Sequence, residues 1–163
     1  MNTTDFIYKA LNGTTTRDSC ASVVKGHDWS DDPSRVVVYS YGSHYPLATI
    51  HEGHAFINNT GYSATTSQHI CKAWSACSLI VGYSNVHYVH LNSRDFTLAD
   101  IVSSARVQRD EIIAVMDSKK RKNTHVYAML ERDLANIQET LSVAEMLLRQ
   151  GEPSIQDGEL ITL

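Results

Sequence analysis

Residues 127–148 read YAMLERDLANIQETLSVAEMLL, and an apolar side chain recurs along them at alternating intervals of three and four residues. The recurring positions are Tyr127, Leu130, Leu134, Ile137, Leu141, Ala144 and Leu148. This spacing, kept over about three heptads, places these side chains in one seam of a long α-helix. The stretch therefore predicts a helix that packs lengthwise against a second helix.

The segment before this stretch has the same periodicity. Thr97 and Asp100 have the spacing of a capping box, which is typical of a helix start. The seam positions that follow are Leu98, Ile101, Ala105, Gln108, Ile112 and Val115. The polar run KKRK at residues 119–122 separates the two expected helices, and Gly151 ends the second. Two long helices joined by a short polar segment favour an antiparallel helical hairpin over residues 95–150.

Apolar residues beside the seams form a second stripe, which suggests that the hairpin packs against another copy. We therefore expect a homodimer. The residues beside the seams are Ile113, Met116, Met146 and Leu147, and the seam residues Leu134 and Leu141 complete the set of candidate self-association residues. The alternative is that each helix covers only the other helix and the sheet.

Residues 1–94 are richer in glycine, tryptophan and tyrosine than the rest of the chain, and they predict a β-rich module. We expect one helix at residues 68–77, capped by Thr65 or Thr66, and residues 5–11 could form a second, short helix. The expected strands are 35–41, 45–50, 54–57, 79–81 and 86–91, with a tight turn at Glu52–Gly53. The predicted fold is α+β: a small antiparallel β-sheet with one short helix (1–94), then a long antiparallel helical hairpin with heptad seams (95–150) and a C-terminal tail (151–163).

Composition excludes several classes of protein. The chain has 163 residues, of which 42% are hydrophobic and 20% charged, so it is not a disordered protein. A net charge of −4 is too small for a DNA mimic and has the wrong sign for a general phosphate binder. The sequence has no apolar run long enough to span a membrane, and its first residues lack the basic segment and apolar stretch of a signal peptide, so we expect neither feature. We therefore expect a cytoplasmic protein with three reduced cysteines and no membrane contact.

Histidine spacing does not predict a metal site. His51 and His54 flank the Glu52–Gly53 turn, but no third ligand is evident, and the pattern is not HExxH. His87 and His90 lie on an expected strand, and we interpret them as partly buried, hydrogen-bonded side chains. The sequence also has no GxSxG, GxxxxGK[ST] or GxGxxG motif. We expect no metal and no cofactor.

Two stretches, VYSYGSHYPLA (38–48) and NNTGYSATTSQH (58–69), resemble a segment that recurs in small uncharacterised bacteriophage proteins. Those proteins share a tyrosine-rich strand, a short hairpin and a YSxTTSxH motif that opens a helix. The resemblance lies within residues 36–76, about a quarter of the chain. It implies a phage origin and a small β-β-α module, and it implies no reaction.

The residues of this segment suggest a binding site. Several hydroxyl groups lie at the expected helix start, where free backbone N–H groups suit an anion or a carbonyl group. Tyrosines add amphipathic contact area, and histidine titrates near neutrality. The candidate residues are Tyr41, His44, Tyr62, Ser63, Thr65, Thr66, Ser67 and His69. The alternative is a capping network in which Thr66 caps the helix and His69 packs on the sheet.

Three functions fit these features. The first is a non-enzymatic phage accessory protein that binds a host or phage protein in the host cytoplasm, and counter-defence inhibitors such as anti-CRISPR proteins form one such class. The second is a nucleic-acid-binding accessory or regulatory protein that uses Lys119, Lys120, Arg121 and Lys122. The third is an enzyme with an unfamiliar His/Ser/Thr site at residues 63–69.

Overall fold

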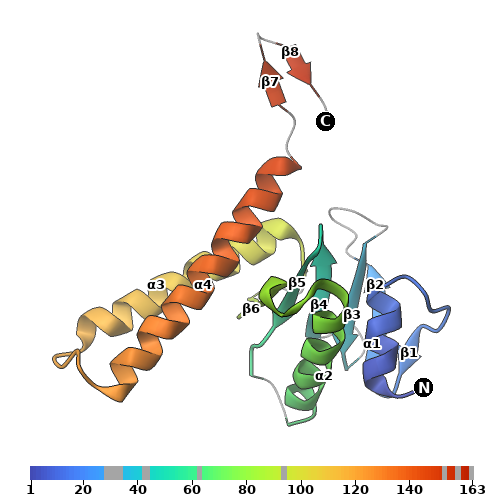
Figure 1. The fold of residues 1–163 in the computed structure, drawn as a ribbon, viewed down its shortest axis with the longest axis horizontal. Helices are drawn as coiled ribbons and strands as arrows, with labels where there is room; N and C mark the ends of the chain where they lie inside the picture. The colour runs from blue at the N-terminus through green and yellow to red at the C-terminus, as the bar shows by residue number, and fades with distance from the viewer. Residues whose placement is uncertain are drawn as a thin grey trace.

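The computed structural model is a sheet with helices on both faces, and two long helices extend away from it (Figure 1). The residues that it describes are 1–27, 35–41, 45–61, 64–92, 95–151, 154–156 and 159–161. The predicted α+β class is confirmed: a mostly antiparallel six-stranded sheet is followed by a helical hairpin.

The six strands of the main sheet lie side by side in the order of the sequence. They are β1 (Ser19–Cys20), β2 (Val23–His27), β3 (Val36–Ser40), β4 (Tyr45–His51), β5 (His54–Asn58) and β6 (Val86–Val89). Each neighbouring pair is antiparallel except β5 and β6, which are parallel. A parallel pair needs a long crossover connection, and the helix between β5 and β6 supplies it.

In the described part of the chain, four α-helices accompany the sheet. They are α1 (Thr3–Leu11), α2 (Ala64–Val81), α3 (Leu98–Ser118) and α4 (His125–Gln150), with a short 3-10 helix η1 (Tyr83–Asn85) before β6. Two further strands, β7 (Ser154–Gln156) and β8 (Glu159–Ile161), pair with each other after α4. Among the described residues, no helix combines the length and apolar character needed to cross a membrane.

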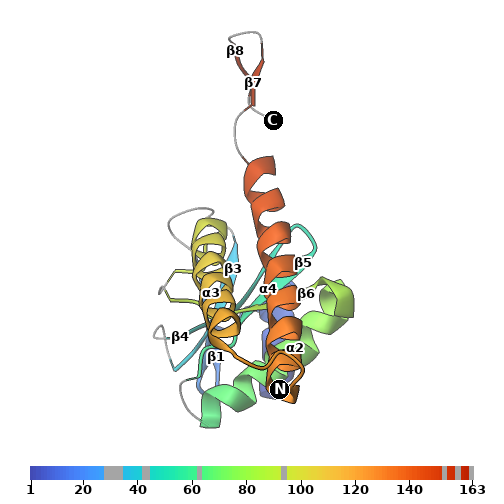
Figure 2. The same ribbon diagram turned by 90° about the vertical axis from the view of Figure 1, so that its left-hand side faces the viewer.

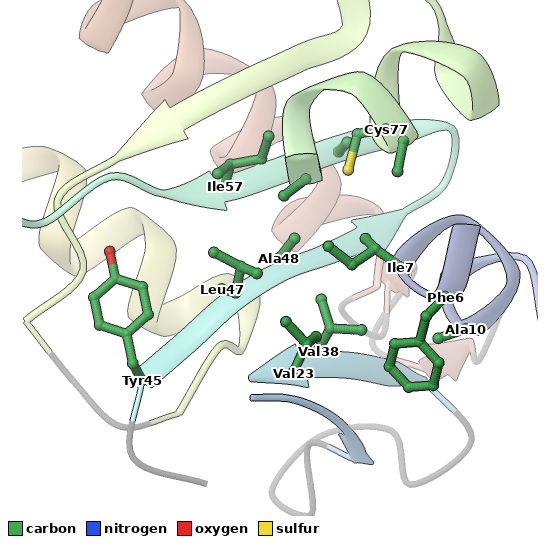
Figure 3. Packing of buried hydrophobic residues seen from close by; sticks show 13 residues of the cluster. Phe6, Ile7, Ala10, Val23, Val38, Tyr45, Leu47, Ala48, Ile57 and Cys77 are labelled. Carbon is green, nitrogen blue, oxygen red and sulfur yellow. The ribbon is translucent and has the colours of Figure 1, made fainter. Parts of the chain in front are cut away.

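The first hydrophobic core lies between the sheet and helices α1 and α2 (Figure 3). Phe6 and Ile7 of α1 pack over Val38 of β3, and all three side chains are fully buried. Ala73, Ala76 and Cys77 bring α2 close to the strands. Because these α2 residues are small, the helix can approach the sheet closely.

The second core lies on the opposite face of the sheet, under the hairpin. Val37 and Phe56 point to this face, while their neighbours Val38 and Ile57 point to the first core. This alternation is what a strand imposes on successive side chains. Ile101 of α3 and Ile137 of α4 are among the hairpin residues that complete the second core, so one end of the hairpin is fixed to the sheet.

The predicted helical hairpin is confirmed, but Val115, an expected seam residue of α3, is 44% exposed. Helices α3 and α4 lie side by side in both views (Figures 1 and 2). The predicted capping box is present: the Thr97 Oγ1 accepts from the Asp100 N–H at 3.0 Å, and an Asp100 carboxylate oxygen accepts from the Thr97 N–H at 3.3 Å. Gly151 follows α4 as predicted.

The β-rich half departs from the prediction in three places. The apolar run at residues 79–81 is the last turn of α2 and is not a strand, because it continues a helix that crosses the first core. Strands β1 and β2 occupy a region with little sequence pattern, and α1 joins α2 so that two helices cover this face. The predicted turn at Glu52–Gly53 is confirmed, with positive φ angles of 45° and 78°.

Candidate functional site

The hydroxyl cluster predicted as a site lies on the first turn of α2. That helix begins at Ala64, so Thr65 and Thr66 are inside it, and the prediction that one of them caps it is wrong. The Thr66 side chain is fully buried, whereas Ser67 is exposed. Three other candidates, His44, Tyr62 and Ser63, lie outside the described residues. The cluster therefore presents only part of its hydroxyl groups to solvent.

His69 is held by a residue that the sequence analysis did not single out. Its Nδ1 lies 2.7 Å from the Oγ of Ser40, at the end of β3. The Ser40 side chain is fully buried and His69 is 4% exposed. The Tyr41 ring lies 6.3 Å from the His69 ring, between centroids. The geometry agrees with the alternative in which His69 packs on the sheet.

Burial, with a smaller effect from the Lys72 charge, lowers the pKa of His69. We expect His69→Ala to lower the free energy of unfolding by about 1–3 kcal/mol, because it leaves the buried Ser40 hydroxyl without this hydrogen bond. Urea denaturation followed by circular dichroism measures the change. Exposed Gln68→Ala is the matched control and should have little effect. An unchanged unfolding midpoint for His69→Ala would contradict a packing role.

A pair of histidines joins β5 and β6 under the hairpin. The His54 Nδ1 and the His87 Nε2 are 3.1 Å apart, and the His87 ring lies 5.4 Å from the Phe56 ring. The expectation of a partly buried, hydrogen-bonded His87 is confirmed, with 5% of the residue exposed. His90 is exposed instead, and its backbone N–H donates to the Gln108 side chain at 2.9 Å. In the described part of the chain, no group of three His, Cys, Asp or Glu residues is placed to hold a metal.

Stability should fall on acidification because of these buried histidines. Burial is the main cause that lowers the pKa of His87; the nearby His54 also lowers it, and Glu139 opposes the shift. Below the ordinary pKa of 6.5 the unfolded chain binds a proton that the folded chain excludes, so stability is complete above this pH and declines below it. Urea denaturation at about pH 7.5 and about pH 5.5 measures the loss. The His87→Gln variant should lose less unfolding free energy on acidification than the parent. If both proteins lose the same amount, His87 is not the source of the pH dependence.

The outer half of the hairpin is less buried than its base. In α3 the buried residues lie between Ile101 and Ala105, and in α4 between Ile137 and Leu147. Residues 106–136, which the structure describes throughout, contain no buried side chain. We call residues 106–136 the distal arm; it projects away from the sheet (Figure 1).

The distal arm nevertheless has large apolar side chains on its surface. The most exposed are Val107, Ile113, Val115, Val126 and Met129, each between 37% and 53% exposed. The predicted cationic run, Lys119 to Lys122, lies at the tip, between the end of α3 and the start of α4, and all four side chains are exposed.

A groove of about 570 Å³ lies between β6 and the distal arm. Its arm side has an apolar floor that includes Ile112 and Leu130. Three carboxylates, from Glu111, Asp133 and Glu139, also line it. We call this the acidic groove. It is formed by residues distant in sequence, so no local motif could have identified it.

The candidate self-association residues fall into two groups. Leu141 and Leu147 are each 5% exposed and belong to the second core, and Leu134 packs against that core. The chain's own fold therefore uses these three side chains. Ile113 and Met146 remain 37% exposed, and Met116 is partly exposed.

Comparison with known proteins identifies no relative: no family model, no curated protein and no solved structure matches this chain.

Proposed function

We propose that this protein acts by binding another macromolecule and that the distal arm is its binding element. The observation that carries the proposal is the contrast within the hairpin. Its base contributes buried side chains to the second core, whereas residues 106–136 contribute none and expose five large apolar residues. Exposed apolar side chains grouped on one projecting element are typical of protein interaction sites.

The physical argument concerns what holds the arm together. Two helices that pack only on each other bury little apolar surface, and in most proteins the stability of a helix comes from packing of its apolar face. The arm has Leu130 and Ile112 partly buried in its seam, but Val126 and Met129 are 53% and 41% exposed. A partner that covers these residues would supply the missing burial. Methionine adapts its shape to different partners, which suits an interaction surface.

The biological setting that we propose is a phage accessory protein that acts in the host cytoplasm. The resemblance of residues 36–76 to bacteriophage proteins supports this setting. Inhibition of a host defence complex, in the manner of anti-CRISPR proteins, is one role that a small binding protein of this kind could perform.

Affinity capture tests the proposal. The tagged parent chain and the tagged arm variant Val126→Glu/Met129→Glu are each recovered from the cells that produce them, and the bound partner is compared. The matched control is Leu79→Glu, because Leu79 is 74% exposed on α2, away from the arm. Circular dichroism first establishes that all three are folded. We expect the arm variant to retain roughly tenfold less partner, as loss of an interface hot spot predicts, and the control to retain it all. Equal recovery by the arm variant and the parent would refute the arm as the binding element.

A second candidate partner is nucleic acid, because the tip presents four consecutive exposed cations. If the tip contacts phosphates, Lys120→Glu/Arg121→Glu should weaken binding to DNA or RNA and flatten its salt dependence. Fluorescence anisotropy with a labelled oligonucleotide at about 50 mM salt measures this. Lys9→Glu, at an exposed position on α1, is the control with the same type of charge change. Absence of binding by the parent protein would remove this candidate.

A further inference from the structure

We propose that the partner of the distal arm is a second copy of this chain, which pairs antiparallel to the first. In this arrangement the cationic tip of each copy lies against the acidic groove of the other. The inference rests on the proposed function, because it names the molecule that the arm binds.

An apolar strip connects the acidic groove to the tip. Val115 lines the groove itself. On α4, Met129 precedes the groove residue Asp133 by four positions, and Val126 precedes Leu130 by four. Residues four apart share one face of a helix. Val115, Val126 and Met129 therefore extend the apolar floor of the groove toward the tip, and all three are 41–53% exposed.

The charges of the arm complement those of a second arm. The tip holds four cations, whereas the rest of the chain holds 10 basic and 18 acidic residues, a net charge of −8. Three of those carboxylates line the acidic groove. The tip of one chain and the groove of another would attract each other, while two tips or two grooves would repel.

The spacing of these charges fits a two-fold symmetric pair. In such a pair, if residue i contacts residue j, then j contacts i. On α3, Glu111 lies four residues before Val115 and Lys119 lies four residues after it. Each of the two is therefore about 6 Å from Val115 along the helix axis, in opposite directions. Asp133 lies four residues from Met129, toward the sheet. If two arms cross antiparallel at Val115 and Met129, the tip of each therefore reaches Glu111 and Asp133 of the other.

This arrangement fits the arm better than a nucleic acid does. A nucleic acid would use the cations but leave Val115, Val126 and Met129 exposed, and Glu111 and Asp133 would repel its phosphates. A second arm covers the apolar strip and neutralises both sets of charges. The four helices together would form a bundle around the strip, which is a common way to bury two amphipathic hairpins.

Sedimentation equilibrium on the full chain tests the pairing. We expect the parent to reach twice its monomer mass of 18.2 kDa at micromolar concentration. Met129→Glu should weaken the dimer by roughly tenfold or more, because it buries a carboxylate in the strip. Leu79→Glu is the matched control and should leave the dimer unchanged.

Charge reversal tests the proposed contacts. Lys119→Glu/Lys120→Glu places anions against the groove, and Glu111→Lys/Asp133→Lys places cations against the tip. Each pair should weaken the dimer by roughly tenfold. The variant with all four substitutions restores the attraction and should bring the dissociation constant back near that of the parent. Circular dichroism at equal concentration establishes that each variant is folded.

Two results would overturn the inference: a parent that remains monomeric across the micromolar range, or single charge reversals that the combined variant does not rescue. Neither result by itself refutes the proposed function. If the parent is monomeric but Val126→Glu/Met129→Glu still abolishes capture of another molecule, the arm remains the binding element and its partner is a different macromolecule.

Discussion

Leu141→Asp should lower the free energy of unfolding by about 4 kcal/mol or more, which is the largest effect expected from a single substitution in the hairpin. Leu141 is 5% exposed and packs in the second core, between α4 and the sheet. The substitution removes a buried apolar side chain and places a carboxylate in its position. Because burial of an unpaired charge is costly, the base of the hairpin should separate from the sheet. Urea denaturation monitored by circular dichroism measures the loss.

Ser142→Asp is the control for this prediction. It introduces the same charge at the next residue of α4, where the side chain is exposed. The urea midpoint of the Ser142→Asp variant should therefore stay close to that of the parent. If Leu141→Asp unfolds at the same urea concentration as Ser142→Asp, the hairpin base does not pack as described.

Phe56→Ala should destabilise the protein by about 3–5 kcal/mol, as expected for truncation of a fully buried aromatic residue. Phe56 lies on β5 with no exposed surface, and its ring lies 5.8 Å from the His51 ring and 5.4 Å from the His87 ring. It joins the sheet to the second core. Thermal or urea unfolding provides the measurement.

Phe56→Leu is the matched variant, because it keeps most of the apolar volume and should cost less than about 1.5 kcal/mol. A loss below about 1 kcal/mol for Phe56→Ala would show that the cavity is filled or that the ring is not central to the second core.

The hairpin could be predicted from sequence because its determinants are local. The alternating spacing from Tyr127 to Leu148 and the capping box at Thr97 depend only on residues a few positions apart. The turn at Glu52–Gly53 was predictable for the same reason. The structure confirms each of these elements.

The rest of the sheet depends on pairing between distant residues, and single-sequence patterns do not specify it. Strand β1 has only two residues, and β2 contains Lys25 and Gly26, so no alternation identifies them. The apolar run at residues 79–81 is short enough to fit either a strand or a buried helix turn. In the structure it ends α2, because that helix must cross the sheet to connect two parallel strands.

The candidate site was only partly predictable. His69 and the hydroxyls of α2 could be identified as a cluster. The hydrogen-bond partner of His69 is Ser40, which lies 29 residues earlier in the chain and so belongs to no local pattern. The heptad pattern continues without change along the hairpin, so it does not reveal that burial stops at Ala105 and begins again at Ile137. That contrast exists only because the hairpin extends beyond the sheet.

Site-specific photo-crosslinking tests the binding role of the distal arm most directly. A benzophenone amino acid replaces Met129, which is exposed on the arm, or Leu79, which is exposed on α2. After irradiation of cells that produce either variant, we predict a discrete covalent adduct from position 129 and none from position 79. Mass spectrometry of the adduct then distinguishes a second copy of this chain from another macromolecule. Absence of an adduct at position 129, or equal adducts at both positions, would contradict the account.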